Sequence, residues 1–285
     1  MPELPEVETV RRTVEPLVVG RRALSVRTSG LPLRLGRPVD VKGLRKALVG
    51  QRIVAVARRA KYLLIEAEGG GVVLVHLGMT GRLTVAAPGA PVRPHTHVTI
   101  GLDGGFELRY ADARRFGFVA PARVDRLDRV PELALLGIEP LGPALTDDAL
   151  AELARGVRTS SKAFLLDQSR VAGLGNIYVC EALFRAGISP RMAAGRLSRP
   201  ELARLRAAIV AVLELGLSNR GTTFSDFIDA DGREGENAEY LRVYLREGEP
   251  CLNGCEATIR RITQNGRSTF FCARCQSRKS MIVAT

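Results

Sequence analysis

The first half of the chain combines one helical pattern with a series of short β-rich segments. Apolar residues recur at helical spacing over residues 5–18, which predicts a helix that starts at Pro5 and ends at Pro16 or shortly after. From Ala23 to about Ala122 the pattern changes to short apolar segments bounded by glycine-rich turns. These segments are 52–57, 62–67, 72–77, 97–102 and 106–110, with turns at 69–71 and 103–105. Such regular spacing predicts a β-sandwich or a β-barrel.

The second half of the chain has helical periodicity. Residues 131–143, which contain three prolines and two glycines, separate it from the first half and predict a domain boundary. Two helices are indicated by their caps: one from Thr146 to about Ala154, and one that opens with Ser198 and Glu201 before the apolar pattern at 202–213. Between them, helical patterns at 163–168 and 177–186 flank a tight turn, Gly173-Leu174-Gly175-Asn176. Such a turn presents backbone N–H groups to phosphate.

The charge of the chain points to a polyanionic partner. Its 285 residues include 42 Lys plus Arg against 30 Asp plus Glu, for a net charge of +12. Because this charge is not gathered on one amphipathic helix, nucleic acid is favoured over an acidic membrane. A content of 46% hydrophobic residues excludes a disordered chain. No apolar run approaches the ~20 residues that span a bilayer, and the acidic N-terminus does not resemble a signal peptide, so we expect a cytoplasmic or nucleoid location.

Four of the five cysteines lie within the last 35 residues, in the pattern Cys251-x3-Cys255-x16-Cys272-x2-Cys275. Two close pairs separated by a span that can form a β-hairpin are typical of a tetrahedral zinc site. The alternative, two disulfides, is disfavoured in a cytoplasmic protein. Four thiolates leave no open coordination position, so the zinc is expected to be structural. Cys180 lies in a helical pattern and is interpreted as a buried small hydrophobe.

The N-terminus carries candidate chemistry. Met1 before a small residue such as Pro2 is ordinarily removed, which exposes a secondary amine. An α-amine has a pKa of about 7.7–8.0, so a useful fraction is an uncharged nucleophile at neutral pH. Attack on a sugar carbon gives an iminium, and Glu3 and Glu6 could move protons and orient the amine. Taken alone, however, Pro5-Glu6 is more simply an ordinary helix start.

Six motifs in sequence, counting the cysteine pattern, resemble bacterial formamidopyrimidine-DNA glycosylases along essentially the whole chain. The motifs are Pro2-Glu3-Leu4-Pro5-Glu6-Val7-Glu8-Thr9, Arg59-Ala60-Lys61-Tyr62, His76-Leu77-Gly78-Met79-Thr80-Gly81, Asp112-Ala113-Arg114-Arg115-Phe116-Gly117 and Gly173-Leu174-Gly175-Asn176-Ile177-Tyr178, with the finger at the end. The resemblance implies an α+β fold: an N-terminal β-sandwich with flanking helices, then a helical domain with a helix-two-turn-helix, then a four-cysteine zinc-finger β-hairpin. The expected domains are residues 1–135, 145–240 and 241–285.

The resemblance also implies a bifunctional base-excision repair enzyme that removes oxidised purines, 8-oxoguanine and formamidopyrimidines, from duplex DNA and then cuts the abasic site by β,δ-elimination. A base must leave the stack before such an enzyme can reach it. The implied catalytic residues are Pro2 as nucleophile, Glu3 as acid/base, Glu6 as its partner near the proline, and Lys61 at the phosphate and sugar of the lesion. The implied DNA contacts are Met79, Arg114 and Phe116 in the vacated space, Asn176, Arg267 and His95 on phosphates, and Lys162 near the lesion. Damaged double-stranded DNA is the expected partner, one structural Zn²⁺ the expected cofactor, and a monomer without an obligate protein partner the expected state.

Three departures from the family pattern affect these expectations. The first cysteine pair is spaced by three residues rather than two, which changes the knuckle but keeps all four ligands. Leu245 stands where glycine is usual in Val-Tyr-Gly-Arg, so the approach to the finger is expected to be repacked. In residues 232–240, which align with the loop that covers the flipped base, Glu234, Glu236 and Asn237 replace the usual proline and aromatic residues.

Two alternative functions remain open on the sequence. One is an endonuclease VIII-like glycosylase for oxidised pyrimidines, which only the altered loop supports. The other is a non-catalytic zinc-finger DNA-binding protein, suggested by the charge and the finger. The set of Pro2, Glu3 and Lys61 argues against the second, because a binding module needs no N-terminal amine.

Overall fold

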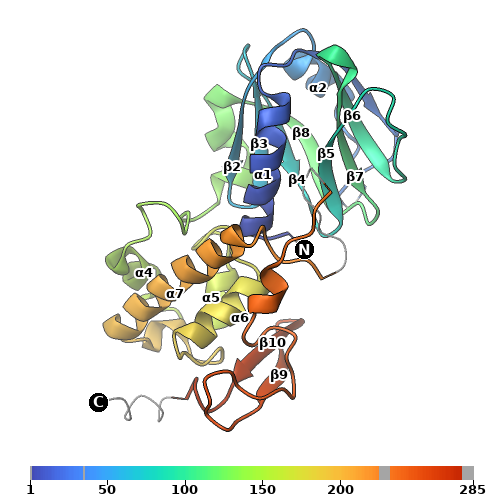
Figure 1. Ribbon diagram of the computed structural model, residues 1–285. Coiled ribbons are helices and arrows are strands. Elements are labelled where there is room, and N and C mark those ends of the chain that lie inside the picture. The colour runs from blue at the N-terminus through green and yellow to red at the C-terminus, as the bar shows by residue number, and fades with distance from the viewer. Residues whose placement is uncertain (1, 35, 225–231, 278–285) are drawn as a thin grey trace. The chain divides into compact units, whose positions relative to one another are not determined.

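The computed structural model describes residues 2–34, 36–224 and 232–277 and divides into two compact units, each of which is described by itself (Figure 1). The first unit comprises Met1–Ala134 and Gly216–Ala238, and the second comprises Leu135–Leu215 and Glu239–Thr285. The chain therefore changes units within the proline-containing stretch 131–143, and a later segment returns to the first unit. The separation of the finger as a third domain stays a prediction.

Two four-stranded antiparallel sheets form most of the first unit, in the orders β1-β6-β7-β5 and β2-β3-β4-β8. The strands are β1 (Ala23–Thr28), β2 (Ile53–Arg59), β3 (Tyr62–Ala67), β4 (Gly71–His76), β5 (Gly81–Ala86), β6 (Thr96–Leu102), β7 (Glu107–Asp112) and β8 (Phe118–Arg123). Both predicted glycine turns join antiparallel partners, β3 to β4 and β6 to β7. Of the two architectures that the sequence left open, the separate sheets are those of a sandwich.

Helices accompany these sheets in the first unit. Helix α1 (Leu4–Val18) extends two residues beyond Pro16 and buries Val7, Val10 and Val14, as predicted. Helix α2 (Val41–Leu48) was not predicted, because its sequence is short and basic and buries only Leu44 and Leu48. The remaining elements are helix α3 (Pro131–Ala134) and the 3₁₀ turns η1 (Asp103–Gly105), η2 (Val124–Arg129) and η4 (Asn237–Tyr240), the last of which spans the boundary of the units.

The second unit is helical and ends in a two-stranded hairpin. Its elements are α4 (Asp147–Ala154), α5 (Ser161–Leu166), α6 (Asn176–Arg185), η3 (Ala194–Arg196), α7 (Arg199–Ser218, whose last turn belongs to the first unit), β9 (Ile259–Gln264) and β10 (Arg267–Cys272). The Thr146 hydroxyl accepts a hydrogen bond from the Ala149 N–H, which confirms the predicted cap. Helices α5 and α6 flank the glycine turn and form the expected helix-two-turn-helix. Cys180 of α6 is buried in one cluster with Phe184, Phe270 and Cys272, so the finger packs against this helix.

Within the part of the chain that the structure describes, no helix combines the length and apolar character that crossing a membrane requires.

Candidate active site and nucleic-acid interface

Glu6 fixes the first residues of helix α1 from inside the first unit. Its Oε2 accepts a hydrogen bond of 2.8 Å from the Glu3 N–H, and the Glu3 side chain in turn accepts from the Glu6 N–H, so the two residues form a reciprocal capping box. Pro2, Glu3 and Glu6 are all buried. Met1 lies outside the described residues. The Glu3 and Glu6 carboxylates therefore cap the start of the helix. The same two carboxylates are also the candidates for acid/base chemistry.

The second oxygen of Glu6 reaches a segment more than 200 residues away in the sequence. Its Oε1 accepts from the Thr222 N–H at 2.7 Å. Gly221 lies directly against this carboxylate: its φ is +86°, and a Cβ there would approach Glu6 Cγ to 2.9 Å. The Thr222 hydroxyl accepts from the Asn237 side-chain amide at 2.8 Å. Gly221, Thr222 and Asn237 therefore belong to the candidate active site, although no local motif in the sequence marked the first two.

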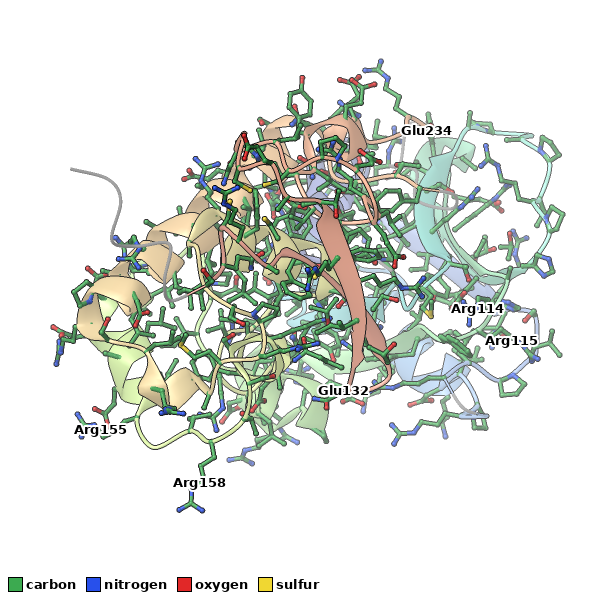
Figure 2. All side chains as sticks on the ribbon, turned by 90° about the horizontal axis from the view of Figure 1, so that it is seen from below. Arg114, Arg115, Glu132, Arg155, Arg158 and Glu234 are labelled. Atoms are coloured by element: carbon green, nitrogen blue, oxygen red, sulfur yellow. The ribbon has the colours of Figure 1, made fainter. Side chains whose placement is uncertain are left out.

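The contact between Thr222 and Asn237 also fixes part of residues 232–240, the segment expected to cover the flipped base. Asn237 is 2% exposed and its N–H donates to the Gly221 carbonyl, so it supports the base of that segment rather than facing a ligand. Glu234 is exposed, and Figure 2 labels it. Glu236 is also exposed. Residues 225–231 lie outside the described part of the chain. Of the three residues that differ from the family pattern here, Glu234, Glu236 and Asn237, Asn237 thus has a structural role.

Lys61 and His76 lie together at one end of strands β3 and β4. Lys61 is buried and immediately precedes β3, and Tyr62 pairs with His76 across the two strands. The His76 ring packs on Tyr62 and Phe118, with centroid distances of 4.9 and 5.9 Å. Burial, with the positive charges of Lys61 and Arg34, lowers the pKa of His76 to about 4.

His76 is consequently neutral at pH 7. Its Nδ1 lies 3.1 Å from the Gly78 N–H and accepts that hydrogen bond, which assigns the ring proton to Nε2. A neutral imidazole with a donor on Nε2, next to a buried ammonium group, suits contact with an anion such as a phosphate. No role was predicted for His76 from the sequence, although the residue lies in one of the motifs.

A buried carboxylate, Asp112, joins the loops that carry Met79, Arg114 and Phe116. Asp112 is 0% exposed. Its Oδ1 accepts from the Thr80 hydroxyl at 2.6 Å, and its Oδ2 accepts from the Gly117 N–H at 2.8 Å and the Tyr110 hydroxyl at 3.1 Å. Burial and the Asp112 charge raise the pKa of Tyr110 far above its ordinary value, so this hydroxyl remains a donor. We call this group of contacts the Asp112 junction.

The residues expected to enter the DNA project from the Asp112 junction. Met79 is 37% exposed and Phe116 43% exposed, so both apolar side chains are accessible to a partner. The Arg114 guanidinium lies 4.6 Å from the centre of the Phe116 ring, and Figure 2 labels Arg114 beside Arg115. His95 is exposed in the loop before β6, and its carbonyl accepts from the Asp112 N–H at 3.0 Å. The structure therefore brings four of the predicted DNA contacts to one junction.

The remaining predicted contacts meet in the second unit at strand β10. Lys162 is 1% exposed, and its ammonium donates to the Ser268 carbonyl and the Thr269 hydroxyl, both at 2.7 Å. The Asn176 side-chain amide donates to the same Ser268 carbonyl at 2.9 Å. Arg267, the residue before Ser268, is exposed. We call this group of contacts the Lys162 junction.

Helix α6 begins at Asn176 and has ten residues. Its N-cap is Gly175, which has no side chain with which to cap the helix, and the Asn176 Oδ1 is buried without a hydrogen-bond partner. A helix N-terminus presents backbone N–H groups to an anion. With Arg267 next to it in the Lys162 junction, this end of α6 is suited to bind a phosphate.

The four cysteines of the finger form one cluster with the geometry of a metal site. Their Sγ atoms all lie within 4.8 Å of one another. Cys251 and Cys275 are 3.8 Å apart and Cys255 and Cys272 are 3.5 Å apart, Sγ to Sγ. Tetrahedral zinc with Zn–S bonds of about 2.3 Å requires Sγ separations of roughly 3.8 Å. All five cysteines are free thiols, so the disulfide alternative is wrong and the cluster fits zinc.

The longer first knuckle of the finger keeps this geometry. Gly254 takes up the additional residue with a φ of +67°, and its N–H donates to the Cys251 carbonyl. The Asn253 side-chain amide lies 3.5 Å from the Cys275 Sγ, where it can donate to a metal-bound thiolate. The three-residue spacing thus retains all four ligands, as expected from the sequence.

The approach to the finger is held by Glu181 of helix α6. Its carboxylate accepts from the N–H groups of Arg242, Val243 and Tyr244 at 2.9–3.0 Å. Burial raises the pKa of Glu181, although these three donors oppose the shift. The next residue, Leu245, has a φ of +61° and is 55% exposed. The backbone thus adopts the left-handed conformation that suits the glycine usual at this position, with leucine in its place.

Comparisons with known proteins agree with this geometry. Family models match residues 1–119 as the formamidopyrimidine-DNA glycosylase N-terminal domain, 136–227 as the H2TH domain of the same glycosylase, and 248–278 as a zinc finger found in FPG and IleRS. A formamidopyrimidine-DNA glycosylase of Gluconobacter oxydans is 47% identical over 279 residues, which cover 97% of this chain and 100% of the relative. The chain belongs to the formamidopyrimidine-DNA glycosylase family.

Solved structures of the family have the same fold. The MutM (FPG) protein from Thermus thermophilus superposes with a TM-score of 0.86 at 38% identity and covers 96% of this chain and 98% of its own. The wild-type Lactococcus lactis Fpg in complex with N7-benzyl-Fapy-dG DNA gives a TM-score of 0.88 at 33% identity, with 97% and 100% covered.

Family membership confirms several predictions together. The α+β fold with sandwich, helix-two-turn-helix and finger is confirmed, as are the zinc site and DNA as the partner. The protein is a DNA glycosylase of base-excision repair that acts on oxidised purines, with abasic-site lyase activity. This finding decides against the non-catalytic binding protein and favours a formamidopyrimidine-DNA glycosylase over the endonuclease VIII-like alternative. The roles of individual residues stay predictions.

Proposed function

We propose that Pro2, once Met1 is removed, is the nucleophile that attacks C1′ of the damaged nucleotide. As the amine forms its bond to C1′, the glycosidic bond breaks and its electron pair leaves with the base, which takes up a proton. The bound amine then loses its proton, and its lone pair opens the sugar ring by breaking the C1′–O4′ bond, whose electron pair stays on O4′ as O4′ takes up a proton. The resulting iminium permits β- and δ-elimination, which release the two flanking phosphates and leave a one-nucleotide gap. Glu3 serves as the acid/base carboxylate in these proton transfers.

A single observation carries this proposal: the buried Glu6 carboxylate binds two backbone N–H groups from distant parts of the chain. One belongs to Glu3, at 2.8 Å, and the other to Thr222, at 2.7 Å. A nucleophile at a chain terminus ordinarily moves freely, and a well-placed nucleophile gains greatly in effective concentration. Fixing the residue after Pro2 supplies that placement.

The other predicted residues are suited to bind a duplex from which one base has been extruded. We propose that Lys61, with His76 beside it, binds the phosphate of the lesion, and that Met79, Arg114 and Phe116 fill the space left by the extruded base. Asn176, Arg267 and His95 bind phosphates. For Lys162, its full burial and its two hydrogen bonds to the hairpin support a role through Ser268 and Thr269, behind the DNA surface.

Borohydride trapping tests the chemistry. The zinc-loaded protein is incubated with a duplex carrying 8-oxoguanine opposite cytosine and, in parallel, with a dihydrothymine duplex. We expect a strong covalent product with the purine lesion. Mass spectrometry of its peptides should place the DNA on the N-terminal residue. Pro2→Gly should weaken the product and Glu6→Gln should reduce its rate, while Glu68→Gln, an exposed control in the turn between β3 and β4, should leave it unchanged.

The contrary results are distinct. A cross-link that maps to a lysine would remove Pro2 as the nucleophile. An equal rate of cross-linking by Glu6→Gln and by the unaltered protein would show that Glu6 does not position the nucleophile. No cross-link with normal binding would mean that the catalytic set is inactive.

We also propose that the protein works in the cytoplasm, on the nucleoid, as a monomer. Its DNA substrate and its net charge of +12 support this proposal. A fluorescent fusion should follow a DNA stain in living cells, and sedimentation should give the mass of one chain. A diffuse or peripheral signal would contradict the nucleoid location.

A further inference from the structure

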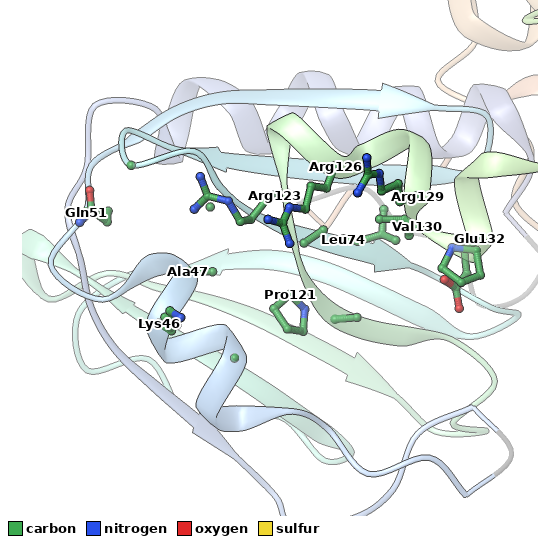
Figure 3. A pocket seen from close by; sticks show the side chains of 16 residues that line it. Lys46, Ala47, Gln51, Leu74, Pro121, Arg123, Arg126, Arg129, Val130 and Glu132 are labelled. Atoms are coloured by element: carbon green, nitrogen blue, oxygen red, sulfur yellow. The ribbon is translucent and has the colours of Figure 1, made fainter.

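A cavity of about 640 Å³ lies in the first unit, away from the candidate active site (Figure 3). Helix α2 borders it on one side, strands β4 and β8 form its floor, and η2 with the start of α3 borders it on the other. Its lining residues include Lys46, Leu74, Pro121, Arg123, Arg126 and Arg129. None of these residues belongs to the candidate active site or to the proposed DNA contacts.

The floor of the cavity is apolar and built from small residues. Leu74 and Pro121 lie on it, with Ala47, Ala120 and Gly71 around them. Gly71 packs closely on the Ala47 backbone, so the hollow results from small side chains next to a tightly packed helix. Its volume lies within the roughly 300–1,000 Å³ that small-molecule sites occupy. A flat contact with a duplex would need no such depth.

Four cations surround this apolar floor. Figure 3 shows Lys46 on the α2 side and Arg123, Arg126 and Arg129 on the side of β8 and η2. Arg123 and Arg126 share one acidic partner, Asp125, at 2.9 and 4.0 Å. Among the described residues, Lys46 and Arg129 have no ion-pair partner. The positive charge is therefore only partly compensated.

The one acidic residue that lines the cavity, among the described residues, does not neutralise these cations. Glu132 instead lies 3.4 and 3.5 Å from Arg34 and Arg37. The cavity is consequently cationic along the arginine side and apolar on its floor. A ligand that matches it carries an anionic group attached to a flat or compact apolar body.

The arginine side of the cavity is distant from the Lys61 and His76 site, whereas Leu74 of its floor lies two positions from His76 in β4. Gly71 and Arg123, which line it, pair with each other at one end of β4 and β8, whereas His76 and Phe118 pair at the other end. Five residue steps along a strand correspond to roughly 16 Å. A ligand against Arg123 would not reach the groups proposed to bind the lesion.

We propose that this cavity binds an organic phosphate of the size of a mononucleotide. Guanidinium groups present paired N–H donors that match phosphate oxygens, and arginine stacks readily on aromatic rings. The phosphate lies against Arg123, Arg126 and Arg129 with Lys46 opposite, and the base covers the floor at Ala120 and Pro121. A free nucleotide and the phosphorylated end of a nucleic acid strand share this chemistry.

Calorimetric titration of the full-length, zinc-loaded protein tests the proposal, with AMP as the probe. We expect saturable binding of AMP, binding about tenfold weaker for inorganic phosphate, and none for adenosine. The double variant Lys46→Glu/Arg129→Glu should weaken AMP binding at least about tenfold. Arg155→Glu/Arg158→Glu, a control with the same change in charge, should leave it unchanged. Both control residues belong to the second unit, and Figure 2 shows Arg158 pointing away from the ribbon.

Two further measurements separate the sources of the ligand. A tetranucleotide with a 5′-phosphate that competes with AMP, when the same oligomer without it does not, identifies a strand end as a ligand. Binding of AMP without this competition identifies a free nucleotide. Absence of saturable AMP binding, or an equal loss in both double variants, overturns the proposal. So does a loss of duplex affinity in Lys46→Glu/Arg129→Glu without any binding of AMP, since the cations would then contact DNA phosphates.

Discussion

Both units hold the side chains proposed to contact DNA with a buried charge, but the charges have opposite signs. In the first unit, Asp112 is 0% exposed and accepts hydrogen bonds from two hydroxyls and a backbone N–H. In the second unit, Lys162 is 1% exposed and donates to a carbonyl and a hydroxyl. Neither residue projects toward solvent, although each lies next to residues that do.

The difference follows from the groups that surround each charge. The Asp112 junction joins the end of β7 to two loops and offers three donors, the Gly117 N–H and the hydroxyls of Thr80 and Tyr110, to which an anion is complementary. The Lys162 junction is the edge of a two-stranded hairpin, where the outward carbonyls have no neighbouring strand. A cation covers such carbonyls. In each junction the sign of the buried charge thus matches the donors or acceptors that surround it.

Removal of zinc should produce the largest difference between the two junctions, because it should disrupt the Lys162 junction and leave the Asp112 junction intact. Structural zinc contributes roughly 10–16 kcal/mol to the folding of finger peptides. Strand β10 carries both Lys162 partners and ends at a zinc ligand, Cys272, whereas the Asp112 junction contains no metal ligand. We therefore expect a chelator to abolish duplex binding and hydrogen-exchange protection in 259–272, with protection in β3 and β4 retained. Restored zinc should restore both, and simultaneous loss in the sandwich would show that the junctions are not independent.

Asp112→Ala should produce the next largest effect. It leaves the Gly117 N–H and the hydroxyls of Thr80 and Tyr110 buried without their acceptor, which should cost about 3 kcal/mol of unfolding free energy. Denaturant unfolding measures this loss, and lesion binding should fall with it because Met79, Arg114 and Phe116 lose their support. Asp128→Ala, at an exposed position, should stay within about 0.5 kcal/mol. A loss below about 1 kcal/mol for Asp112→Ala would mean that the loops hold without the carboxylate.

Lys162→Met should be milder and should distinguish support from contact. Loss of two charged hydrogen bonds, with the apolar part of the side chain retained, should lower the unfolding free energy by about 2 kcal/mol and weaken duplex binding. The dependence of affinity on salt should stay unchanged, because a residue behind the surface neutralises no phosphate. Arg267→Met should instead lower the slope of log K against log salt by about 0.9. An equal reduction for Lys162→Met would place its ammonium on a phosphate.

The features that could be predicted from the sequence depend on neighbours in the chain. The zinc ligands lie in two short pairs, the hairpin turns adjoin their strands, and Thr146 caps the helix that follows it. Helix α2 was missed because two buried apolar residues in eight give no periodic signal. Asp112 stood out in the sequence only as part of a motif, because its bond to the Thr80 hydroxyl joins two segments 32 positions apart, and no local pattern shows this bond.

The candidate active site depends even more on contacts between residues far apart in the sequence. Glu6 could be proposed from its closeness to Pro2, but its bond to Thr222 spans 216 positions. No spacing rule relates residues so far apart. Similarly, Lys162 could be expected near DNA from the resemblance, whereas its burial against Ser268 and Thr269 depends on how α5 packs on the hairpin.

Replacement of Leu245 should have the smallest effect on the unfolding free energy, and it should raise that energy where the other substitutions lower it. Its positive φ follows directly after the segment that Glu181 holds, so the left-handed turn is imposed by its neighbours. A leucine in this conformation is strained by about 1 kcal/mol, and its side chain, 55% exposed, recovers little by packing. Leu245→Gly should therefore raise the unfolding free energy of the second unit by up to about 1 kcal/mol, even though glycine costs more entropy on folding. Leu135→Gly, at a position 77% exposed that lacks a positive φ, should lower it instead. If both substitutions destabilise equally, the turn at Leu245 carries no strain, and the repacked approach to the finger has relaxed around the leucine.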